Sequence, residues 1–242
     1  MAVGATVGSG AAVAPEMPVI QLTDVIRVYR EADVETIALR GVDIEIGPGE
    51  FVAIMGRSGS GKSTLLQLLA GSDRPTAGRV MVQGIDLSRA TEDERAELRG
   101  SRVGIVFQSQ NLVPFLDLGE NIMLAARLGG HPVDLDTALG ILARVGLDGR
   151  SDHRPDQLSG GEQQRAALAL VLVGRPSVVL ADEITGELDS TSATRLLDLL
   201  VDLHRADAMT VVLATHDPEV AGRADRIVEL RDGRIVSDRR LR

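Results

Sequence analysis

Cysteine and tryptophan are absent from this chain, tyrosine occurs once, and lysine supplies only one of the 26 basic side chains. Without cysteine the protein forms no disulfide, holds no thiolate metal site and has no cysteine nucleophile. This composition fits a reducing compartment such as the cytosol. Because arginine is a broad planar fork and lysine a compact point charge, the single Lys62 indicates a position that requires the smaller cation. The alternative is that one lysine survives by chance in an arginine-rich composition.

Long apolar runs and a net positive charge are also missing. The longest apolar run, AALALVLVG at 166–174, has nine residues, whereas a membrane-spanning helix needs about 20. The net charge of −9 and the pI of about 5.0 argue against nucleic acid as the main partner, because a phosphate backbone attracts a basic face. The opening MAVGATVGSGAAVAPEMP lacks the basic start of a signal peptide, and we interpret residues 1–18 as a disordered N-terminal extension.

Short apolar segments alternate with helical patterns along the rest of the chain. FVAIM and MTVVLA are continuous apolar runs, typical of strands buried on both faces, and RIVELRDGRIV carries the Asp-Gly turn of a β-hairpin. Between 116 and 173 the pattern becomes helical. Strand–helix alternation on both sides of this segment predicts an α/β core with an inserted helical subdomain. The predicted strands are 42–46, 51–55, 79–85, 103–107, 177–181 and 209–214, and the predicted helices lie near 63–71, 91–99, 118–128, 135–145, 160–173 and 191–205.

A glycine-rich loop follows the apolar strand at 51–55. GRSGSGKS, residues 56–63, fits the pattern G-x-x-x-x-G-K-[ST] between a strand and a helix. The glycines let backbone N–H groups close around phosphate oxygens, and the helix N-terminus adds a favourable dipole. Lys62 then reaches the β- and γ-phosphates and Ser63 binds Mg²⁺, which explains a compact cation here. The other predicted nucleotide-binding residues of this loop are Gly56, Arg57, Ser58, Gly59, Ser60, Gly61 and Thr64.

Two carboxylates end the apolar run SVVLADE at 177–183. At the end of a buried strand, Asp182 is placed to hold Mg²⁺ through water, and Glu183 to orient the attacking water as general base. The alternative is a strand that simply ends in a solvated acidic turn. The phosphate-binding loop upstream in the same chain favours the catalytic interpretation.

LSGGEQQR at 158–165 combines a helix cap with two glycines. Ser159 and Glu162 form the capping-box pattern, so a well-capped helix is the simplest interpretation. Gly160 and Gly161 in the first turn cost the helix about 1 kcal/mol each, which is reasonable if phosphate must approach the backbone there. Since a phosphate loop already exists at 56–63, a second phosphate-contacting turn indicates that two chains face each other.

In their order and spacing these motifs closely resemble the nucleotide-binding subunits of ABC transporters, from about residue 19 to the C-terminus. The resemblance implies a P-loop NTPase (RecA-like) core with an antiparallel β subdomain. It also implies that 19–242 form a single ATPase domain in which a helical subdomain is inserted at about 109–173. The matched positions are Gly56–Thr64 as Walker A, Gln108 as the Q-loop glutamine that binds Mg²⁺, Leu158–Gln163 as the signature, Asp182 and Glu183 as Walker B and catalytic glutamate, Asp189 as the D-loop aspartate and His216 as the switch histidine.

Finer similarity points to one branch of that family. ELRGSRVGIVFQSQNLVPFLDLGENI, HRPDQLSGGEQQR and ADEITGELDS are similar to the MacB/LolD/FtsE group. Tyr29 matches the aromatic that stacks on adenine in the family, although a lone tyrosine after a strand is otherwise a packing residue. Two positions depart from the group: Ile184 replaces a proline and Leu170 replaces an arginine. The predicted catalytic residues are all present, so we still expect hydrolysis.

The mechanism implied by the resemblance is a head-to-tail homodimer with two ATP molecules at its interface, each between Walker A of one chain and the signature of the other. In this scheme Glu183 is the base, His216 contacts the γ-phosphate, and Asp189 braces the dimer. Gln108 links the Mg²⁺ site to the helical subdomain. The resemblance further implies separate transmembrane permease subunits, MacB- or FtsX-like, that hold the ATPase at the cytoplasmic face of the membrane and recognise the substrate.

Two other functions stay open at this point. Some ABC ATPases are soluble and serve iron–sulfur assembly or regulation, and a degenerate chain can be a purely structural partner of an active one. Intact Glu183 and His216 argue against the latter. The remaining histidines, His131, His153 and His204, show no metal-ligand spacing and are interpreted as solvated, and the terminal RRLR as a frayed basic tail.

Overall fold

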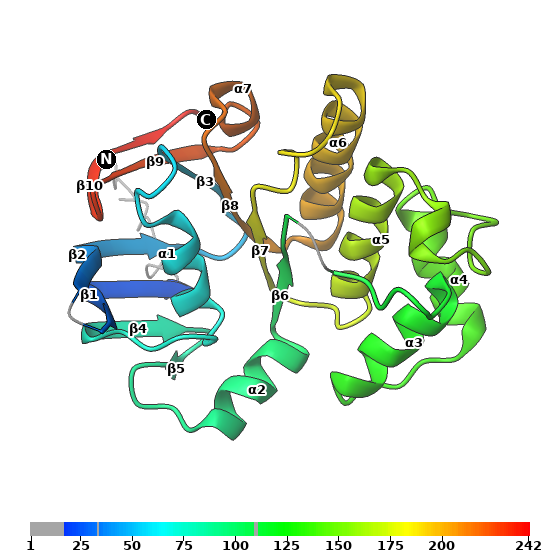
Figure 1. Ribbon diagram of the computed structural model, residues 1–242, viewed down its shortest axis with the longest axis horizontal. Helices are drawn as coiled ribbons and strands as arrows, with labels where there is room; N and C mark the ends of the chain where they lie inside the picture. Colours follow the sequence, from blue (N-terminus) through cyan, green and yellow to red (C-terminus); the bar gives the residue numbers. More distant parts are fainter. Residues whose placement is uncertain (1–16, 33, 109–110) are drawn as a thin grey trace, which may run out of the picture.

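The computed structural model describes residues 17–32, 34–108 and 111–242, so most of the predicted N-terminal extension lies outside the described residues. Two sheets organise the described part of the chain (Figure 1). The smaller sheet is antiparallel, and its strand order is β2-β1-β4-β5. Its strands are β1 Ile20–Glu31, β2 Val34–Ile46, β4 Ala77–Val82 and β5 Ile85–Asp86.

The larger sheet has the order β10-β9-β3-β8-β7-β6. Its five strands from β9 to β6 run parallel, and β10 closes the edge antiparallel to β9. The carboxyl ends of the parallel strands therefore meet at one edge of the sheet, where ligands bind in open α/β sheets. The strands are β3 Phe51–Met55, β6 Val103–Val106, β7 Val178–Asp182, β8 Thr210–Thr215, β9 Arg226–Arg231 and β10 Arg234–Arg240.

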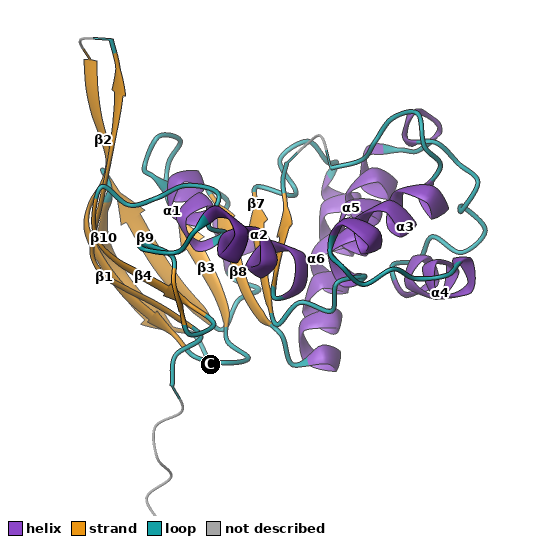
Figure 2. Ribbon diagram, turned by 90° about the horizontal axis from the view of Figure 1, so that it is seen from below, coloured by secondary structure: helices purple, strands orange, loops and turns teal. Residues whose placement is uncertain are grey.

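Helices cover the larger sheet, and three of them form the segment between β6 and β7. Figures 1 and 2 both show α3, α4 and α5 gathered at the end of the molecule opposite the antiparallel sheet. This arrangement confirms the predicted fold class of an α/β core with an antiparallel β part and a helical insert. The helices are α1 Lys62–Leu69, α2 Glu92–Ser101, α3 Leu118–Leu128, α4 Leu135–Arg144, a 3-10 turn at Pro155–Gln157, α5 Gly160–Leu172, α6 Ser190–Asp207 and α7 Pro218–Ala221.

Two hydrophobic cores lie on the two faces of the larger sheet. Along β3, Val52 and Ile54 face the core shared with α1 and the antiparallel sheet, whereas Phe51 and Ala53 face the core shared with α3, α5 and α6. Because successive strand residues point to opposite faces, a strand with cores on both sides must be apolar at every position. This explains why FVAIM shows no alternation.

Three strand predictions differ from the structure. The strand β1 is not among the predicted elements, although its first half is buried at Ile20, Leu22 and Val25. The strand β2 begins at Val34 rather than at 42, because the outer part of this hairpin is exposed and carries no apolar pattern. The predicted strand 79–85 is divided by a turn in which Gln83 and Gly84 have φ values of 51° and 77°. Such left-handed backbone reverses the chain between β4 and β5.

His204 and the C-terminus also correct the prediction. His204 is buried rather than solvated: its Nδ1 lies 2.7 Å from the Met209 carbonyl oxygen, and its ring packs against Phe51. The terminal arginines are not frayed, because β10 extends to Arg240, whose guanidinium lies 2.9 Å from the Glu50 carboxylate. Within the described ranges, no helix combines the length and apolarity needed to cross a bilayer.

Candidate active site

The glycine-rich loop connects β3 to α1 and requires glycine at its two ends. A Cβ on Gly56 would lie 2.4 Å from the Leu230 carbonyl oxygen, and one on Gly61 would lie 2.6 Å from the Ala38 carbonyl oxygen. Gly61 is also left-handed, with φ of 105°, and α1 begins without a side-chain cap. The first N–H groups of α1 are therefore left for another acceptor, and a phosphate is the acceptor that such a helix end favours.

Lys62 lies inside this loop, with only 4% of its surface exposed. Its Nζ is 2.9 Å from the Gly56 carbonyl oxygen, 3.2 Å from that of Arg57, and 3.1 Å from Oε1 of Glu183. An ammonium offers three donors around a single atom and matches these three oxygens. A planar guanidinium is too broad for the same enclosure, which gives the single lysine a physical reason.

Glu183 follows β7 and lies between the Lys62 ammonium and the His216 ring. Its Oε2 is 3.3 Å from Nδ1 of His216, which follows β8. Burial raises the pKa of Glu183, but hydrogen bonding and charge from Lys62, together with His216, outweigh burial and hold the pKa below its usual value. Its backbone is left-handed, with φ of 46°, and its N–H donates to the Ala214 carbonyl oxygen at 3.0 Å. Such strain in a non-glycine residue is typical of functional sites.

Asp182 ends β7 beside the loop and carries a buried carboxylate oxygen, Oδ1, that has no hydrogen-bond partner among the described residues. Burial raises the pKa of Asp182, the Ser63 hydroxyl opposes this by hydrogen bonding, and the charge of Glu183 adds to it. The hydroxyl of Ser60 is likewise buried and unpartnered. The Asp182 carboxylate at the end of β7 and the Ser63 hydroxyl at the start of α1 are hard oxygen donors. Mg²⁺ takes such donors together with substrate phosphates, so Asp182 and Ser63 fit the metal.

Gln108 is turned toward a different group. The side-chain amide of Gln108 donates to Oε1 of Glu187 at 3.4 Å. The backbone carbonyl oxygen of Gln108 accepts a hydrogen bond from the side-chain amide of Gln164. No contact in the described structure joins Gln108 to Ser63 or Asp182. Of the three predicted metal donors, only Ser63 and Asp182 therefore lie together. In the described part of the chain, no group of three histidine or acidic side chains could hold a metal ion.

The signature residues lie away from the loop. Figures 1 and 2 both place α5 and α1 on opposite sides of β7. The predicted capping box is present: the Ser159 N–H donates to the Glu162 carboxylate at 2.9 Å, and the Glu162 N–H donates to the Ser159 hydroxyl at 3.4 Å. The first turn of α5 packs on α6, because a Cβ on Gly161 would lie 3.1 Å from Cβ of Ser192.

Asp189 caps α6 next to this turn. Its Oδ1 accepts from the N–H groups of Thr191 and Ser192, both at 3.0 Å. The pKa of Asp189 is lowered by these hydrogen bonds, from Ser192 first. The structure thus brings together two groups of predicted residues: the loop with Asp182, Glu183 and His216, and the signature with Asp189.

Tyr29 lies within β1 rather than after a strand. Its hydroxyl donates to Oδ2 of Asp73 at 2.9 Å, and the guanidinium of Arg27 lies over its ring, 4.4 Å from the centroid. Asp73 and Arg27 are not among the sequence-predicted residues, nor is Glu187 beside Gln108. No local pattern marks Asp73 or Glu187, because each contacts a residue distant in sequence. Arg27 contacts the nearby Tyr29 but is itself paired with the distant Asp73.

An uncapped helix behind a glycine loop, an enclosed lysine and carboxylates at the end of a neighbouring strand define a P-loop nucleotide hydrolase. The model of the family described as "ABC transporter" matches residues 39–186, and the chain belongs to that family. This confirms the predicted family, its fold, and an ATP-hydrolysing enzyme that binds ATP.

Relatives cover most of this chain. It is 48% identical over 223 residues to a macrolide export ATP-binding/permease protein MacB of Hyphomonas neptunium, covering 91% of this chain but only 34% of that protein. It is 46% identical to a lipoprotein-releasing system ATP-binding protein LolD of Anaeromyxobacter dehalogenans, covering 91% of this chain and 94% of LolD. The chain thus spans about a third of the MacB relative and nearly all of the LolD relative.

Solved structures show the same architecture. The chain superposes with a TM-score of 0.85 on the dimeric ATP-binding cassette MJ0796 in a post-hydrolysis state bound to ADP and Pi, at 38% identity. The match covers 92% of this chain and 99% of that one. CbiO1 of Clostridium perfringens, part of the ABC transporter complex CbiONQ, matches with a TM-score of 0.80 at 29% identity over 92% of this chain and 88% of that one.

Proposed function

We propose that the chain hydrolyses ATP at the loop 56–64, with Glu183 as the general base and Lys62 binding the β- and γ-phosphates. The observation that carries this proposal is that the Glu183 carboxylate contacts both Nζ of Lys62, at 3.1 Å, and Nδ1 of His216, at 3.3 Å, beside the loop. Glu183 accepts a proton from water as the water oxygen attacks the γ-phosphorus, and ADP leaves with the electrons of the broken P–O bond. His216 donates to the γ-phosphate.

Lys62 is paired with Glu183, its Nζ lying 3.1 Å from Oε1. A γ-phosphate within reach of Lys62 competes for the same ammonium, since a phosphate offers more negative charge than a carboxylate. Glu183 is then released from the Lys62 ammonium, which lowers its pKa, and becomes a stronger base. Phosphate binding and activation of the base are coupled in this way by one side chain.

Ser63 and Asp182 would hold Mg²⁺, and Gln108 would join them after turning from Glu187. The metal, when bound, neutralises charge on the phosphates. The unpartnered Oδ1 of Asp182 supports this assignment. We assign residues 19–242 to one ATPase unit, and its helical subdomain to about 109–173.

The active form proposed is a head-to-tail homodimer. Within one chain the signature turn at Ser159 lies on the far side of β7 from the loop, so the two phosphate-contacting groups meet only when a second chain supplies one of them. Asp189, which caps α6 beside the signature, is positioned to reach the same interface. The dimeric MJ0796 cassette supports this arrangement.

The test is Glu183→Gln, which keeps the size of the side chain and removes the proton acceptor. We expect it to bind MgATP, to accumulate as a dimer on light scattering, and to lose turnover by about a hundredfold or more. Glu35→Gln, on the exposed β1–β2 hairpin, is the matched control and should retain activity. Unchanged turnover in Glu183→Gln would show that another group is the base, and an ATP-bound monomer would contradict the dimer.

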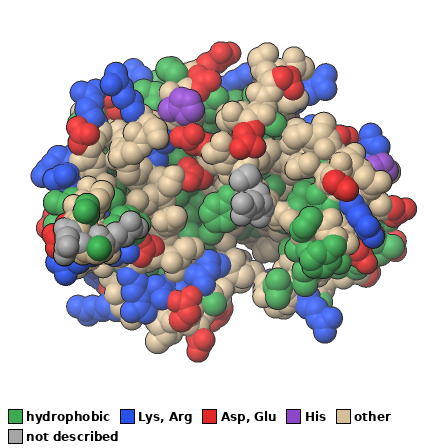
Figure 3. Space-filling model, viewed as in Figure 1, with side chains coloured by type: hydrophobic (Ala, Val, Ile, Leu, Met, Phe, Trp, Pro, Cys, Tyr) green, Lys and Arg blue, Asp and Glu red, His purple; other side chains and the backbone are tan. Residues whose placement is uncertain are grey.

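A groove between the core and the helical segment is the proposed docking surface for a separate membrane partner. Its lining includes apolar Phe107, Leu128 and Leu170, and Figure 3 shows hydrophobic side chains beside a hollow on this face. Phe107 and Leu128 are 46% and 79% exposed. Among the described residues, the lining holds two arginines, Arg99 and Arg102, and no aspartate or glutamate. The occupant is therefore an apolar segment with acidic residues.

The names of the MacB and LolD relatives support a transporter role, with the ATPase held at the cytoplasmic face of the membrane by its permease and driven through ATP-dependent dimer closure. Leu170, which departs from the family pattern, adds to the apolar lining of the groove, and Ile184 is buried in the core at 2% exposure. Both are accommodated without disturbing the loop or the carboxylates. Macrolide or peptide export, lipoprotein release and mechanical signalling are the candidate tasks of the whole complex.

A further inference from the structure

The tyrosine proposed to stack on adenine is held by an acidic residue outside every recognised motif. Asp73 accepts a hydrogen bond from the Tyr29 hydroxyl at 2.9 Å and one from Nε of Arg27 at 2.7 Å, both on Oδ2. Oδ1 accepts from the N–H of Arg74 at 2.7 Å. Both oxygens of the carboxylate are thus used. The Tyr29 hydroxyl also lies 3.4 Å from Oε1 of Gln67, so Asp73 makes the shorter of the two contacts that hold the phenol ring.

Arg27 occupies one side of that ring. Its guanidinium lies 4.4 Å from the ring centroid, within the range of a cation–π contact. A base can therefore stack only on the opposite face of Tyr29. The Asp73 carboxylate accepts hydrogen bonds from both Arg27 and the Tyr29 hydroxyl. It therefore orients the Tyr29 ring and also holds Arg27 on one face, which leaves the other face open.

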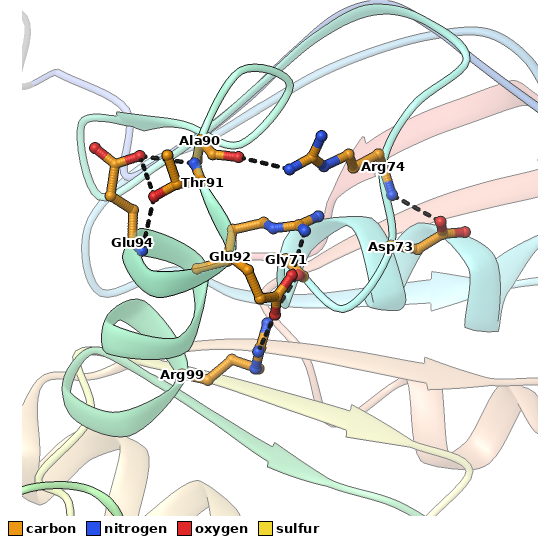
Figure 4. A network of polar contacts seen from close by, with 9 residues as sticks. Gly71, Asp73, Arg74, Ala90, Thr91, Glu92, Glu94 and Arg99 are labelled. Atoms are coloured by element: carbon orange, nitrogen blue, oxygen red, sulfur yellow. Dashed lines mark hydrogen bonds and ion pairs between the residues drawn. The ribbon is translucent and has the colours of Figure 1, made fainter.

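Asp73 lies in the short segment that follows α1, the helix that begins at the phosphate-binding loop. The first residue of α1 is Lys62, so the platform and the phosphate loop belong to one connected unit. Figure 4 shows how the segment after α1 is tied to α2: Arg74 donates to the Ala90 carbonyl oxygen at 3.0 Å, and Arg99 donates to that of Gly71 at 2.8 Å. The spacing between ring and loop is therefore held by hydrogen bonds at both ends of this segment.

We infer that Asp73 is a positioning residue for the nucleotide base, acting through Tyr29 and Arg27 to hold one open stacking face at a set distance from the phosphate loop. This inference rests on the proposed role of Tyr29. In ATP the sugar limits the distance from the base to the phosphates. If the Tyr29 ring is not held in place, the base loses its stacking contact even when the phosphates bind well.

The test uses the composition of the chain. Tyr29 is the only tyrosine and tryptophan is absent, so intrinsic tyrosine fluorescence reports on this ring alone. We would titrate the full chain with MgATP and, separately, with inorganic triphosphate and Mg²⁺, following Tyr29 emission and confirming each Kd by calorimetry. Asp73→Ala should raise the Kd for MgATP about fivefold, the lower end of the loss of a base–aromatic stack. The Kd for triphosphate and kcat at saturating ATP should stay unchanged.

Four variants separate the possible outcomes. Tyr29→Ala tests the platform itself, and adding Asp73→Ala to it should weaken binding no further, because Asp73 acts through the ring. Asp73→Asn keeps one acceptor and should fall between wild type and Asp73→Ala. Asp86→Ala removes a comparable carboxylate, paired with Arg79 at 2.8 Å in the same sheet, and should leave both Kd values unchanged.

Each remaining result contradicts a different statement. If Tyr29→Ala weakens ATP binding and neither Asp73 variant does, the positioning role is wrong while the platform stands. If neither position matters, the proposed role of Tyr29 is wrong as well. If Asp73→Ala and Asp73→Asn weaken triphosphate as much as ATP, Asp73 supports the loop rather than the base, and the inference is overturned.

Discussion

At the scale of single residues, this active site depends on close contacts that only certain side chains can make. Lys62 is enclosed by three oxygens, and Glu183 holds a left-handed backbone between Lys62 and His216. Asp182 has a buried carboxylate oxygen with no hydrogen-bond partner among the residues that the structure describes. Each of these features costs folding free energy or restricts the choice of residue, as expected where a protein is arranged for a ligand rather than for its own stability.

Replacing Lys62 with arginine tests the fit of the cation. Lys62→Arg keeps the charge, but the wider fork no longer fits between the Gly56 carbonyl and Glu183. We expect the Kd for MgATP to rise by about tenfold or more, the scale of a lost charge-assisted hydrogen bond, when measured by calorimetry. The control is Arg205→Lys, which exchanges one basic side chain for the other at an exposed position of α6 and should bind as wild type. Normal binding by Lys62→Arg would contradict the steric explanation.

Removing the charge of Asp182 should stabilise the nucleotide-free protein while destroying activity. Burial raises the pKa of Asp182, so the folded protein holds this proton more tightly than the unfolded chain. The ionised carboxylate therefore destabilises the fold fully above its folded-state pKa, and the penalty disappears below the unfolded-state pKa of about 3.9.

Asp182→Asn should accordingly raise the free energy of unfolding by about 1 kcal/mol at pH 7, with a gain that shrinks as the pH falls toward 4. Urea unfolding at several pH values measures it, and Asp148→Asn on the surface is the control. A loss of stability at pH 7 would mean that Asp182 contributes a favourable interaction in the folded state.

At the scale of elements, a capping box with a hydroxyl side chain begins two helices with different surroundings, α2 and α5. Thr91 and Glu94 cap α2, and Ser159 and Glu162 cap α5, with reciprocal hydrogen bonds in both cases. The α2 turn holds its helix against the segment after α1, as Figure 4 shows. The α5 turn carries two glycines and is proposed to meet a phosphate. One local motif thus serves stability alone in one helix and binding as well in the other.

Comparing the two caps separates these roles. Thr91→Ala and Ser159→Ala should each lower the free energy of unfolding by about 1 kcal/mol, as measured by thermal or urea unfolding. Only Ser159→Ala should also weaken ATP-driven dimerisation, followed by light scattering in the Glu183→Gln background. Equal effects of both variants on the dimer would show that α5 requires the cap only for its own stability.

At the scale of the whole molecule, the larger sheet separates two cores and keeps the two phosphate-contacting groups apart. The loop and Asp182 belong to the side of α1, whereas Ser159 and Asp189 belong to the side of α5 and α6. In the proposed dimer a second chain completes each site, and the groove beside α3, the proposed docking surface, lies between the core and the helical segment.

Leu128→Glu tests the groove without touching the active site. Leu128 is 79% exposed, so the substitution should change stability by no more than about 0.5 kcal/mol and leave ATP hydrolysis of the isolated chain unchanged. The measurement is a pull-down of the tagged Glu183→Gln chain from membranes solubilised in mild detergent with MgATP. An integral membrane protein should co-purify with this chain, and it should be absent when the chain also carries Leu128→Glu. Retention despite the change would place the partner elsewhere. Recovery of only soluble partners would favour a non-transport ATPase.

The sequence by itself determined the elements that have strong local patterns. FVAIM, the loop with Lys62, the capping boxes and the Asp232-Gly233 hairpin turn are formed as predicted, because strand burial, helix caps and turn backbone depend on neighbouring residues. The order of the motifs was sufficient to predict the family. The exposed outer half of the β1–β2 hairpin has no such pattern and was not predicted.

Only the tertiary structure decided which distant residues meet. Asp73 beside Tyr29, Glu187 beside Gln108, and His204 packed against Phe51 each join segments whose spacing in the chain carries no periodic signal. It also decided that the signature lies on the far side of β7 from the loop. These contacts follow from how two cores pack on one sheet, and packing between distant segments is a property of the folded chain rather than of any local pattern.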